Sequence, residues 1–209
     1  MTTPMRPCPF EADLAIVDAA LRATFPNDFD RRCMYAAFGL RDRLRAAGHL
    51  AEILAGDFLC FSLSQDGSQA ILDGFGTVSA DPPSHFWVEA AGVRLDLGPH
   101  YLPRRARFAA VDIPPLCWAL SVPLPHYLRY RRSLRYHPDV ELAPDSPLID
   151  RLASFRAACT RDVATTPQSP WRWVLRSPGA LTAAARSGDP WARGARRFLA
   201  VAQPSELPF

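Results

Sequence analysis

The segment that decides the fold is His85-Phe86-Trp87-Val88-Glu89-Ala90-Ala91-Gly92-Val93-Arg94-Leu95-Asp96-Leu97. Its residues alternate between a wholly apolar set and a set that contains every polar residue, which is the period-two pattern of β-strands. Glycine readily adopts the positive φ of a two-residue hairpin turn, so Ala91-Gly92 is predicted to be that turn, although asparagine would suit it better than alanine. The register that follows pairs Val88 with Leu95, Glu89 with Arg94 and Ala90 with Val93.

This register gives the predicted hairpin two different faces. One face is apolar, and the other carries His85, Trp87, Glu89, Arg94 and Asp96. A slip of one residue would place Asp96 among the apolar side chains, so the pattern favours this pairing. His85 and Asp96 become diagonal neighbours roughly 7–8 Å apart, within reach of an imidazole–carboxylate hydrogen bond. A half-buried hairpin whose polar face meets water shows the same alternation, so the hairpin alone leaves a structural role open.

A second segment places a thiol at the start of a helix. Apolar residues recur at helical spacing over residues 31–47, Asp30 is a suitable N-cap, and Gly48 is a suitable stop. Cys33 then lies in the first turn, where the helix dipole and unbonded N–H groups favour a thiolate and can stabilise an oxyanion. Free cysteine is also a common core residue, which is the structural alternative. A thiol, a histidine and an aspartate are the three groups of a cysteine-type catalytic triad, in which they act as nucleophile, base and orienter.

Three pieces of the chain resemble one enzyme family: Cys33-Met34-Tyr35-Ala36-Ala37-Phe38, His85-Phe86-Trp87-Val88-Glu89, and Leu95-Asp96-Leu97. They are similar to the transglutaminase-like branch of the papain-like cysteine enzymes, with a more distant similarity to arylamine N-acetyltransferases. The resemblance implies an α+β fold in which the cysteine-bearing helix packs on an antiparallel sheet behind N-terminal helices. It also implies that Cys33 is the nucleophile, His85 the base and Asp96 the orienter.

The remaining sequence predicts how the chain is organised. Residues 1–125 are expected to form the transglutaminase-like core, and residues 126–209 a mostly helical C-terminal extension. Within the core, helical spacing covers residues 11–25, while residues 50–55 are ambiguous between helix and strand. Other expected elements are a strand at 58–63, a turn at 65–68, a short strand at 69–72 and a loop at 73–84. In the extension, residues 148–158 are expected to be helical.

Composition excludes several classes of protein. The five cysteines are odd in number and scattered, and neither Cys-x-x-Cys nor His-Glu-x-x-His occurs, so neither disulfides nor a metal site is expected. A reducing cytoplasm is the expected compartment. All 24 cationic side chains are arginines, which rules out a lysine Schiff base and a lysine-containing phosphate loop. No signal peptide and no membrane span is expected, and no cofactor is required.

These observations favour a cysteine-dependent acyl-transfer enzyme acting on a peptide, amide, ester or thioester. Trp87, His100 and Tyr101 are expected to line its substrate site, and Cys117 with His126 is a weaker rival pair. The first alternative is a non-catalytic binding or scaffold protein of the same fold, suggested because glycine follows Asp96-Leu97 where the family usually has threonine. The second is a binder of anionic partners through the basic run Arg129–Arg135. A net charge of +3 makes nucleic acid an unlikely partner, and the sequence leaves the oligomeric state open.

Overall fold

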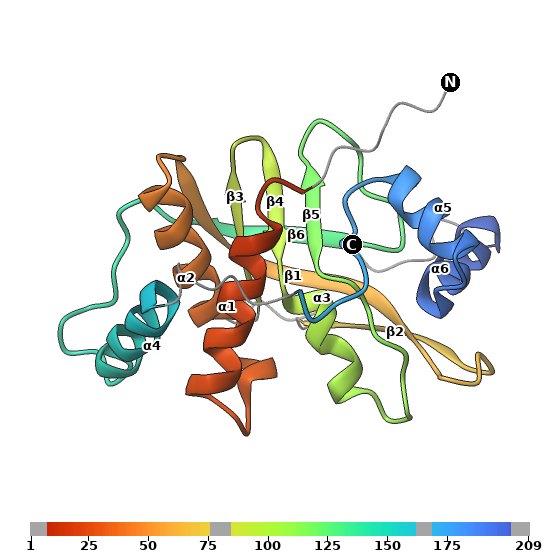
Figure 1. Cartoon of the computed structure of the whole chain (residues 1–209), viewed down its shortest axis with the longest axis horizontal. Coiled ribbons are helices and arrows are strands. Elements are labelled where there is room, and N and C mark those ends of the chain that lie inside the picture. The colour runs from red at the N-terminus through yellow and green to blue at the C-terminus, as the bar shows by residue number, and fades with distance from the viewer. Residues whose placement is uncertain (1–7, 76–84, 162–168, 202–209) are drawn as a thin grey trace.

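The computed structural model describes residues 8–75, 85–161 and 169–201, and within them the fold is α+β, as predicted (Figure 1). The helices are α1 (Glu11–Thr24), α2 (Cys33–Ala46), α3 (Gly98–Tyr101), α4 (Ile149–Arg161), α5 (Pro178–Arg186) and α6 (Pro190–Val201), with 3-10 turns η1 (Phe29–Arg31) and η2 (Leu102–Arg105). The strands are β1 (Ala51–Leu63), β2 (Ala70–Phe75), β3 (His85–Ala90), β4 (Val93–Asp96), β5 (Leu116–Ala119) and β6 (Arg129–Arg135).

The hairpin is present in the predicted register. Strands β3 and β4 pair antiparallel, with Glu89 opposite Arg94. Ala91 and Gly92 form the turn, with φ of 47° and 75° respectively. Two successive positive φ angles define a type I′ turn, whose twist matches that of the strands it joins. The apolar face packs into a core, and the Glu89 carboxylate accepts two hydrogen bonds from the Arg94 guanidinium.

Helix α2 carries Cys33 as its first residue, and its start differs from the prediction. Asp30 does not cap it, because residues 29–31 form the separate turn η1 and Arg32 occupies the cap position without a side-chain hydrogen bond. The far end is as predicted. Gly48 has a φ of +83°, and the N–H groups of Gly48 and His49 close back onto the carbonyls of Arg45 and Leu44. This pattern is a Schellman motif.

Strand β1 is the centre of the sheet. Its first half pairs with β3, its second half with β2, and its middle with β6, all antiparallel, while β3 continues through β4 to β5. The ambiguous residues 50–55 are therefore strand, continuous with the predicted strand at 58–63. A bulge in the β6 pairing lies at Gly56, where a Cβ would stand 2.0 Å from the carbonyl oxygen of Arg131. Only glycine allows the two backbones to approach so closely.

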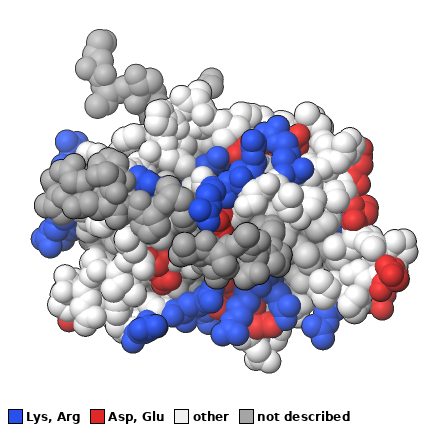
Figure 2. Space-filling model, turned by 180° about the vertical axis from the view of Figure 1, so that it is seen from behind, with Lys and Arg blue, Asp and Glu red and all other residues white. Residues whose placement is uncertain are grey.

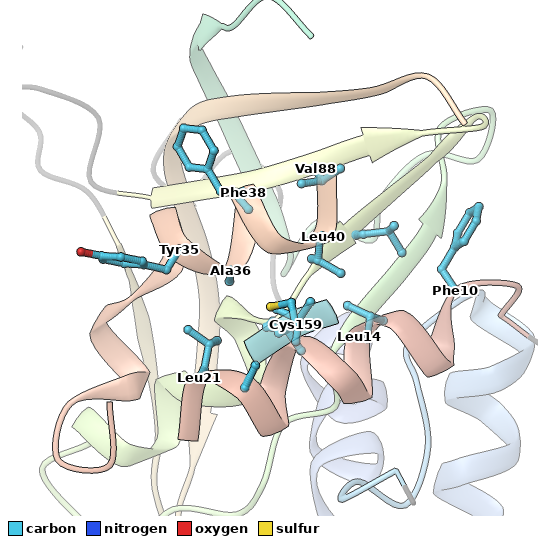
Figure 3. Close-up of a cluster of buried hydrophobic side chains, with 14 of the residues drawn as sticks. Phe10, Leu14, Leu21, Tyr35, Ala36, Phe38, Leu40, Val88 and Cys159 are labelled. Carbon is cyan, nitrogen blue, oxygen red and sulfur yellow. The ribbon is translucent and has the colours of Figure 1, made fainter. Parts of the chain in front are cut away.

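Two apolar cores lie at opposite ends of the sheet. The first is formed by α1, α2, α4 and the apolar face of the hairpin. Figure 3 shows Leu14 and Leu21 of α1 beneath the α2 residues Phe38 and Leu40, with Val88 of β3 above Leu40. The second lies under α5 and α6 and contains the stacked rings of Phe61 and Trp191, 5.2 Å apart. Helix α2 therefore covers the face of the hairpin opposite to the one that carries most of its polar groups.

The region after residue 126 is more than a helical extension. Arg129–Arg135, placed there in the prediction, is strand β6 and belongs to the sheet, and α4 contributes Leu152 and Phe155 to the first core. Arg131 of that strand pairs with Asp57, and Arg135 with Glu52 and Glu89. The segments before and after the predicted boundary at residues 125 and 126 therefore share one sheet and one core.

The expectation that the cysteines are unpaired is wrong. A disulfide joins Cys8 to Cys117 on β5, with Cα atoms 6.4 Å apart. It also removes the rival nucleophile, since Cys117 is not a thiol here. Cys33, Cys60 and Cys159 remain outside disulfides. Pairing across 109 residues leaves no local spacing signature, which explains why the sequence gives no sign of it. None of the helices in the described ranges is long and apolar enough to cross a bilayer.

Replacing Ala91 with asparagine should stabilise the protein. Alanine in the left-handed region is strained by about 1 kcal/mol, whereas asparagine tolerates it and is preferred before glycine in type I′ turns. Thermal unfolding of Ala91→Asn is expected to shift upward by about 2–4 °C. An Ala91→Val variant is the matched control and should unfold at a lower temperature, because β-branching worsens the same strain. An unchanged or reversed order would contradict the assigned turn.

Loss of the disulfide should destabilise the fold under oxidising conditions. Cys8→Ala combined with Cys117→Ala is expected to lower the free energy of unfolding by about 2–4 kcal/mol, since the unfolded chain regains the freedom that the long closed loop removes. Denaturant titration with and without reductant measures the effect. Reductant should bring the wild type toward the level of the variant and leave the variant unchanged. A wild type that does not respond to reductant would argue against the bond.

Candidate active site

The polar face of the hairpin places His85 against Asp96. The Nε2 atom of His85 lies 2.7 Å from Oδ2 of Asp96, and both side chains are buried, at 0% and 2% exposure. The pair bridges the first residue of β3 and the last residue of β4, which the hairpin register makes diagonal neighbours. The imidazole–carboxylate hydrogen bond expected from that register is therefore present. A short bond between an imidazole and a buried carboxylate fixes the orientation of the ring.

Asp96 is held by two further donors. The hydroxyl of Tyr130, on β6, donates to Oδ2 at 2.6 Å, and the backbone N–H of Gly98 donates to Oδ1 at 2.7 Å. Burial, the charge of Asp96 and this hydrogen bond together hold the pKa of Tyr130 well above its ordinary value, so the hydroxyl keeps its proton. A buried carboxylate needs such donors, because without them it would lose its solvation uncompensated.

A glycine is required at position 98 because its backbone lies very close to the side chains of His85 and Asp96, and not because of an unusual φ angle. A Cβ on this residue would stand 2.3 Å from Cε1 of His85 and 3.0 Å from Oδ1 of Asp96. Any larger residue would therefore push the imidazole away from the carboxylate. The glycine lets the backbone after β4 turn under the ring and direct an N–H at Asp96.

The third predicted residue, Cys33, interacts with the same imidazole. Burial favours neutral His85, but the charge of Asp96, the hydrogen bond with Asp96 and the interaction with Cys33 outweigh it and raise the pKa of His85 to about 10. Since Nε2 is engaged by Asp96, Nδ1 is the ring nitrogen available to the thiol. At neutral pH both nitrogens then carry protons, which is the imidazolium form that pairs with a thiolate.

Aromatic rings enclose the imidazole of His85. Phe75, the last residue of β2, stacks on it at 4.9 Å with an interplanar angle of 13°, and Phe58 of β1 lies 5.5 Å away. These two phenylalanines are directly paired across β1 and β2, so one strand register supplies both. Tyr130 lies 6.4 Å away on the same side. The rings exclude water from the imidazole–carboxylate bond, which strengthens it.

The three residues predicted to bind substrate have different positions. Trp87 and Tyr101 are packed inside the protein, at 1% and 2% exposure, and the hydroxyl of Tyr101 donates to Asp18 at 2.6 Å. His100 is half-buried, with Nδ1 2.8 Å from the carbonyl oxygen of Ile113. It lines a cavity of about 330 Å³ together with Trp171 and Asp112, and neither Cys33 nor His85 borders that cavity. The structure thus shows packing and hydrogen-bonding roles for these residues, and substrate contact by any of them stays a prediction.

The start of α2 offers donors beside the thiol. The first backbone N–H that bonds within the helix belongs to Ala36, so the amides of Cys33, Met34 and Tyr35 precede the helical hydrogen-bond ladder. An oxyanion formed on a carbonyl attacked by Cys33 would meet this positive end of the helix. A groove of about 470 Å³ opens beside it, bordered by Arg32 and Ser154 among others. Among the described residues, no group of three or more His, Cys, Asp or Glu side chains could hold a metal ion.

Sequence reasoning missed three contributors: Tyr130, Gly98 and Phe75. Tyr130 sits in the basic run of the region predicted to be a mostly helical extension, and only the β1–β6 pairing brings it to Asp96. Gly98 stands directly after the hairpin, and a glycine two residues past a buried aspartate was the one available signal. Phe75 comes from a strand that was expected to end at residue 72 and in fact continues to 75.

A scan against protein-family models found no match, and searches of curated proteins and of solved structures found none either. The interpretation of this site therefore depends on its geometry and on the resemblance of its short motifs.

Removing the Tyr130 hydroxyl should destabilise the folded protein. Tyr130→Phe leaves a buried carboxylate without one of its donors, so the free energy of unfolding is expected to fall by about 1.5–3 kcal/mol in denaturant titration. The matched control is Tyr127→Phe. The hydroxyl of Tyr127 is buried with no hydrogen-bond partner among the described residues, so its removal should cost little. In an Asp96→Asn background the cost of Tyr130→Phe should shrink, and an undiminished cost would contradict the assigned bond.

Proposed function

We propose that this protein is a cysteine-dependent acyl-transfer enzyme that uses a Cys33–His85–Asp96 triad on a peptide, amide, ester or thioester. The observation that carries the proposal is the buried His85, which is hydrogen-bonded to Asp96 and interacts with Cys33 at the first residue of a helix. Each part has the position that its role requires: a half-exposed nucleophile, a buried base and an orienter fixed by two further donors. A papain-like core and the transglutaminase-like family belong to the same proposal.

The reaction would proceed in two steps. The Cys33 thiolate attacks the carbonyl carbon, a C–S bond forms, and the oxyanion faces the amides at the start of α2. The bond to the leaving group then breaks, and the leaving group takes the proton from the His85 imidazolium, which leaves a thioester. In the second step, water or an amine attacks the thioester and gives a proton to His85, the C–S bond breaks, and the thiolate–imidazolium pair is restored. Asp96 holds the imidazole in place throughout and needs no proton of its own.

The other sequence hypotheses fare differently against the structure. A binder of anionic partners through Arg129–Arg135 has less support, because Arg131 and Arg135 are engaged with carboxylates of the same sheet. A non-catalytic protein of the same fold predicts an ordinary thiol at residue 33, which can be measured directly. A cytoplasmic location remains part of the proposal, and the disulfide between Cys8 and Cys117 weighs against it, since such bonds persist mainly in oxidising compartments.

The decisive experiment is the pH dependence of iodoacetamide alkylation at each cysteine, mapped by mass spectrometry. Cys33 should react rapidly and almost independently of pH between about 6 and 9, because the raised pKa of His85, about 10, maintains the imidazolium across that range. In His85→Ala, the rate at pH 6 should fall by roughly 100-fold, the thiolate deficit of an ordinary thiol.

The chain supplies internal controls for this measurement. Cys60 and Cys159 are buried, and burial raises the pKa of each thiol to about 12, so both should resist alkylation in the folded protein. A panel of acyl donors then tests turnover, with Cys33→Ser as the inactive variant. If Cys33 in the wild type reacts as slowly at pH 6 as it does in His85→Ala, no thiolate–imidazolium pair exists and the enzyme proposal fails.

A further inference from the structure

Two neighbouring arginines of η2 lie over the two aromatic rings that flank the candidate site. The guanidinium carbon of Arg104 is 4.5 Å from the ring centroid of Phe29, and that of Arg105 is 5.2 Å from the ring centroid of Phe75. Both arginines are exposed to solvent. A guanidinium held over an aromatic ring loses less conformational freedom when it binds an anion than a freely moving side chain does.

One of these rings contacts the imidazole of His85, and the other belongs to the turn that precedes Cys33 in the chain. Phe75 stacks on the imidazole of His85 at 4.9 Å, which places Arg105 on the outer side of that ring and within about 10 Å of the imidazole. Phe29 belongs to η1, the turn that ends just before the N-cap of α2 and its first residue, Cys33. Arg105 therefore stands beside the ring that covers the imidazole, and Arg104 lies over a ring of the turn that precedes Cys33 in the chain.

The charge of these two arginines is not used within the described part of the chain. Neither Arg104 nor Arg105 forms an ion pair with a carboxylate of the described residues. Nearby carboxylates are engaged elsewhere: Asp18 binds Arg22 and Tyr101, and Asp28 binds Arg32. Asp30 of η1 is the remaining acidic group in the turns that flank the site. Figure 2 shows arginine side chains along the lower edge of the molecule, with acidic side chains among them.

We propose that Arg104 and Arg105 bind an anionic group, a carboxylate or a phosphate, on the acyl donor that Cys33 attacks. This inference rests on the proposed function, and it names the substrate class: an acyl compound with a negative charge within about 10 Å of the reacting carbonyl. Two guanidinium groups match the oxygens of a carboxylate or a phosphate with paired hydrogen bonds. The rings of Phe29 and Phe75 supply the apolar walls between the anion and the reacting centre.

The test compares two alkylating reagents of nearly equal size, anionic iodoacetate and neutral iodoacetamide. In both reactions the Cys33 sulfur forms a bond to carbon and iodide leaves, so the ratio of the two rates reports the electrostatic potential at the thiolate. The ratio is divided by the same ratio for N-acetylcysteine. A unit charge about 10 Å away changes the rate roughly twofold in water, so each arginine at such a distance from the thiolate should raise the normalised ratio about twofold at low salt. The ratio should fall toward one at 1 M salt.

Variants separate charge from structure. Arg104→Gln with Arg105→Gln should lower the normalised ratio by about twofold for each charge at that distance, and Arg104→Lys with Arg105→Lys should retain it. Arg186→Gln, an exposed arginine on α5 at the far end of the sheet, is the matched control and should leave the ratio unchanged. A wild-type ratio near one, or a ratio unaffected by salt, overturns the inference even if the double glutamine variant does not fold.

The result distinguishes this inference from the proposal on which it rests. Rapid alkylation of Cys33 by iodoacetamide without a preference for iodoacetate would support the enzyme proposal and contradict the anion site. Slow alkylation by both reagents would contradict the enzyme proposal itself. Protection of Cys33 by succinate alone would identify the anion as a carboxylate, and protection by inorganic phosphate alone would identify it as a phosphate. If neither succinate nor phosphate protects Cys33, at concentrations too low to change the ratio of rates through ionic strength, the protein does not bind a discrete anion and the inference is overturned.

Discussion

The buried carboxylate of Asp96 is the constraint on which the rest of the structure depends. A charge at 2% exposure is tolerated only when donors surround it, and here there are three: the imidazole of His85, the hydroxyl of Tyr130 and the amide of Gly98. They come from β3, β6 and the start of α3. The hairpin register, the pairing of β6 with β1 and the turn after β4 must all be correct for one side chain to be satisfied. Errors in any of them would leave the charge unpaired.

The same arrangement divides the hairpin into two chemical surfaces. Its apolar face meets α1, α2 and α4, and this packing determines where α2 begins relative to β3 (Figure 3). Its other face carries the imidazole and carboxylate under a cover of phenylalanine rings. Cys33, the first residue of α2, thus interacts with His85 where the two surfaces meet. Successive residues of β3 serve the two surfaces in turn. Phe86 and Val88 pack into the core, while His85 and Trp87 point the other way.

Local patterns were sufficient for the hairpin, its turn and the helix that carries Cys33, because period-two and period-3.6 alternation act within a few residues. The relation between His85 and Asp96 followed from the register alone. What the sequence could not reveal were contacts made across long separations: Tyr130 with Asp96, Cys8 with Cys117, and Phe75 with His85. The strand at Arg129–Arg135 was missed for the same reason, since its partners lie on β1, 70 or more residues earlier. The Asp30 cap failed because η1 intervenes.

The disulfide encloses the site in a covalent ring. Cys33, His85 and Asp96 all lie between Cys8 and Cys117, whereas Tyr130 lies outside. One break of the backbone between the two bridged cysteines would leave both fragments joined, with Cys33, His85 and Asp96 still on one molecule. Nicked protein would run as a single species until it is reduced. The disulfide therefore keeps these three residues covalently connected even when the backbone between the two cysteines is cut once.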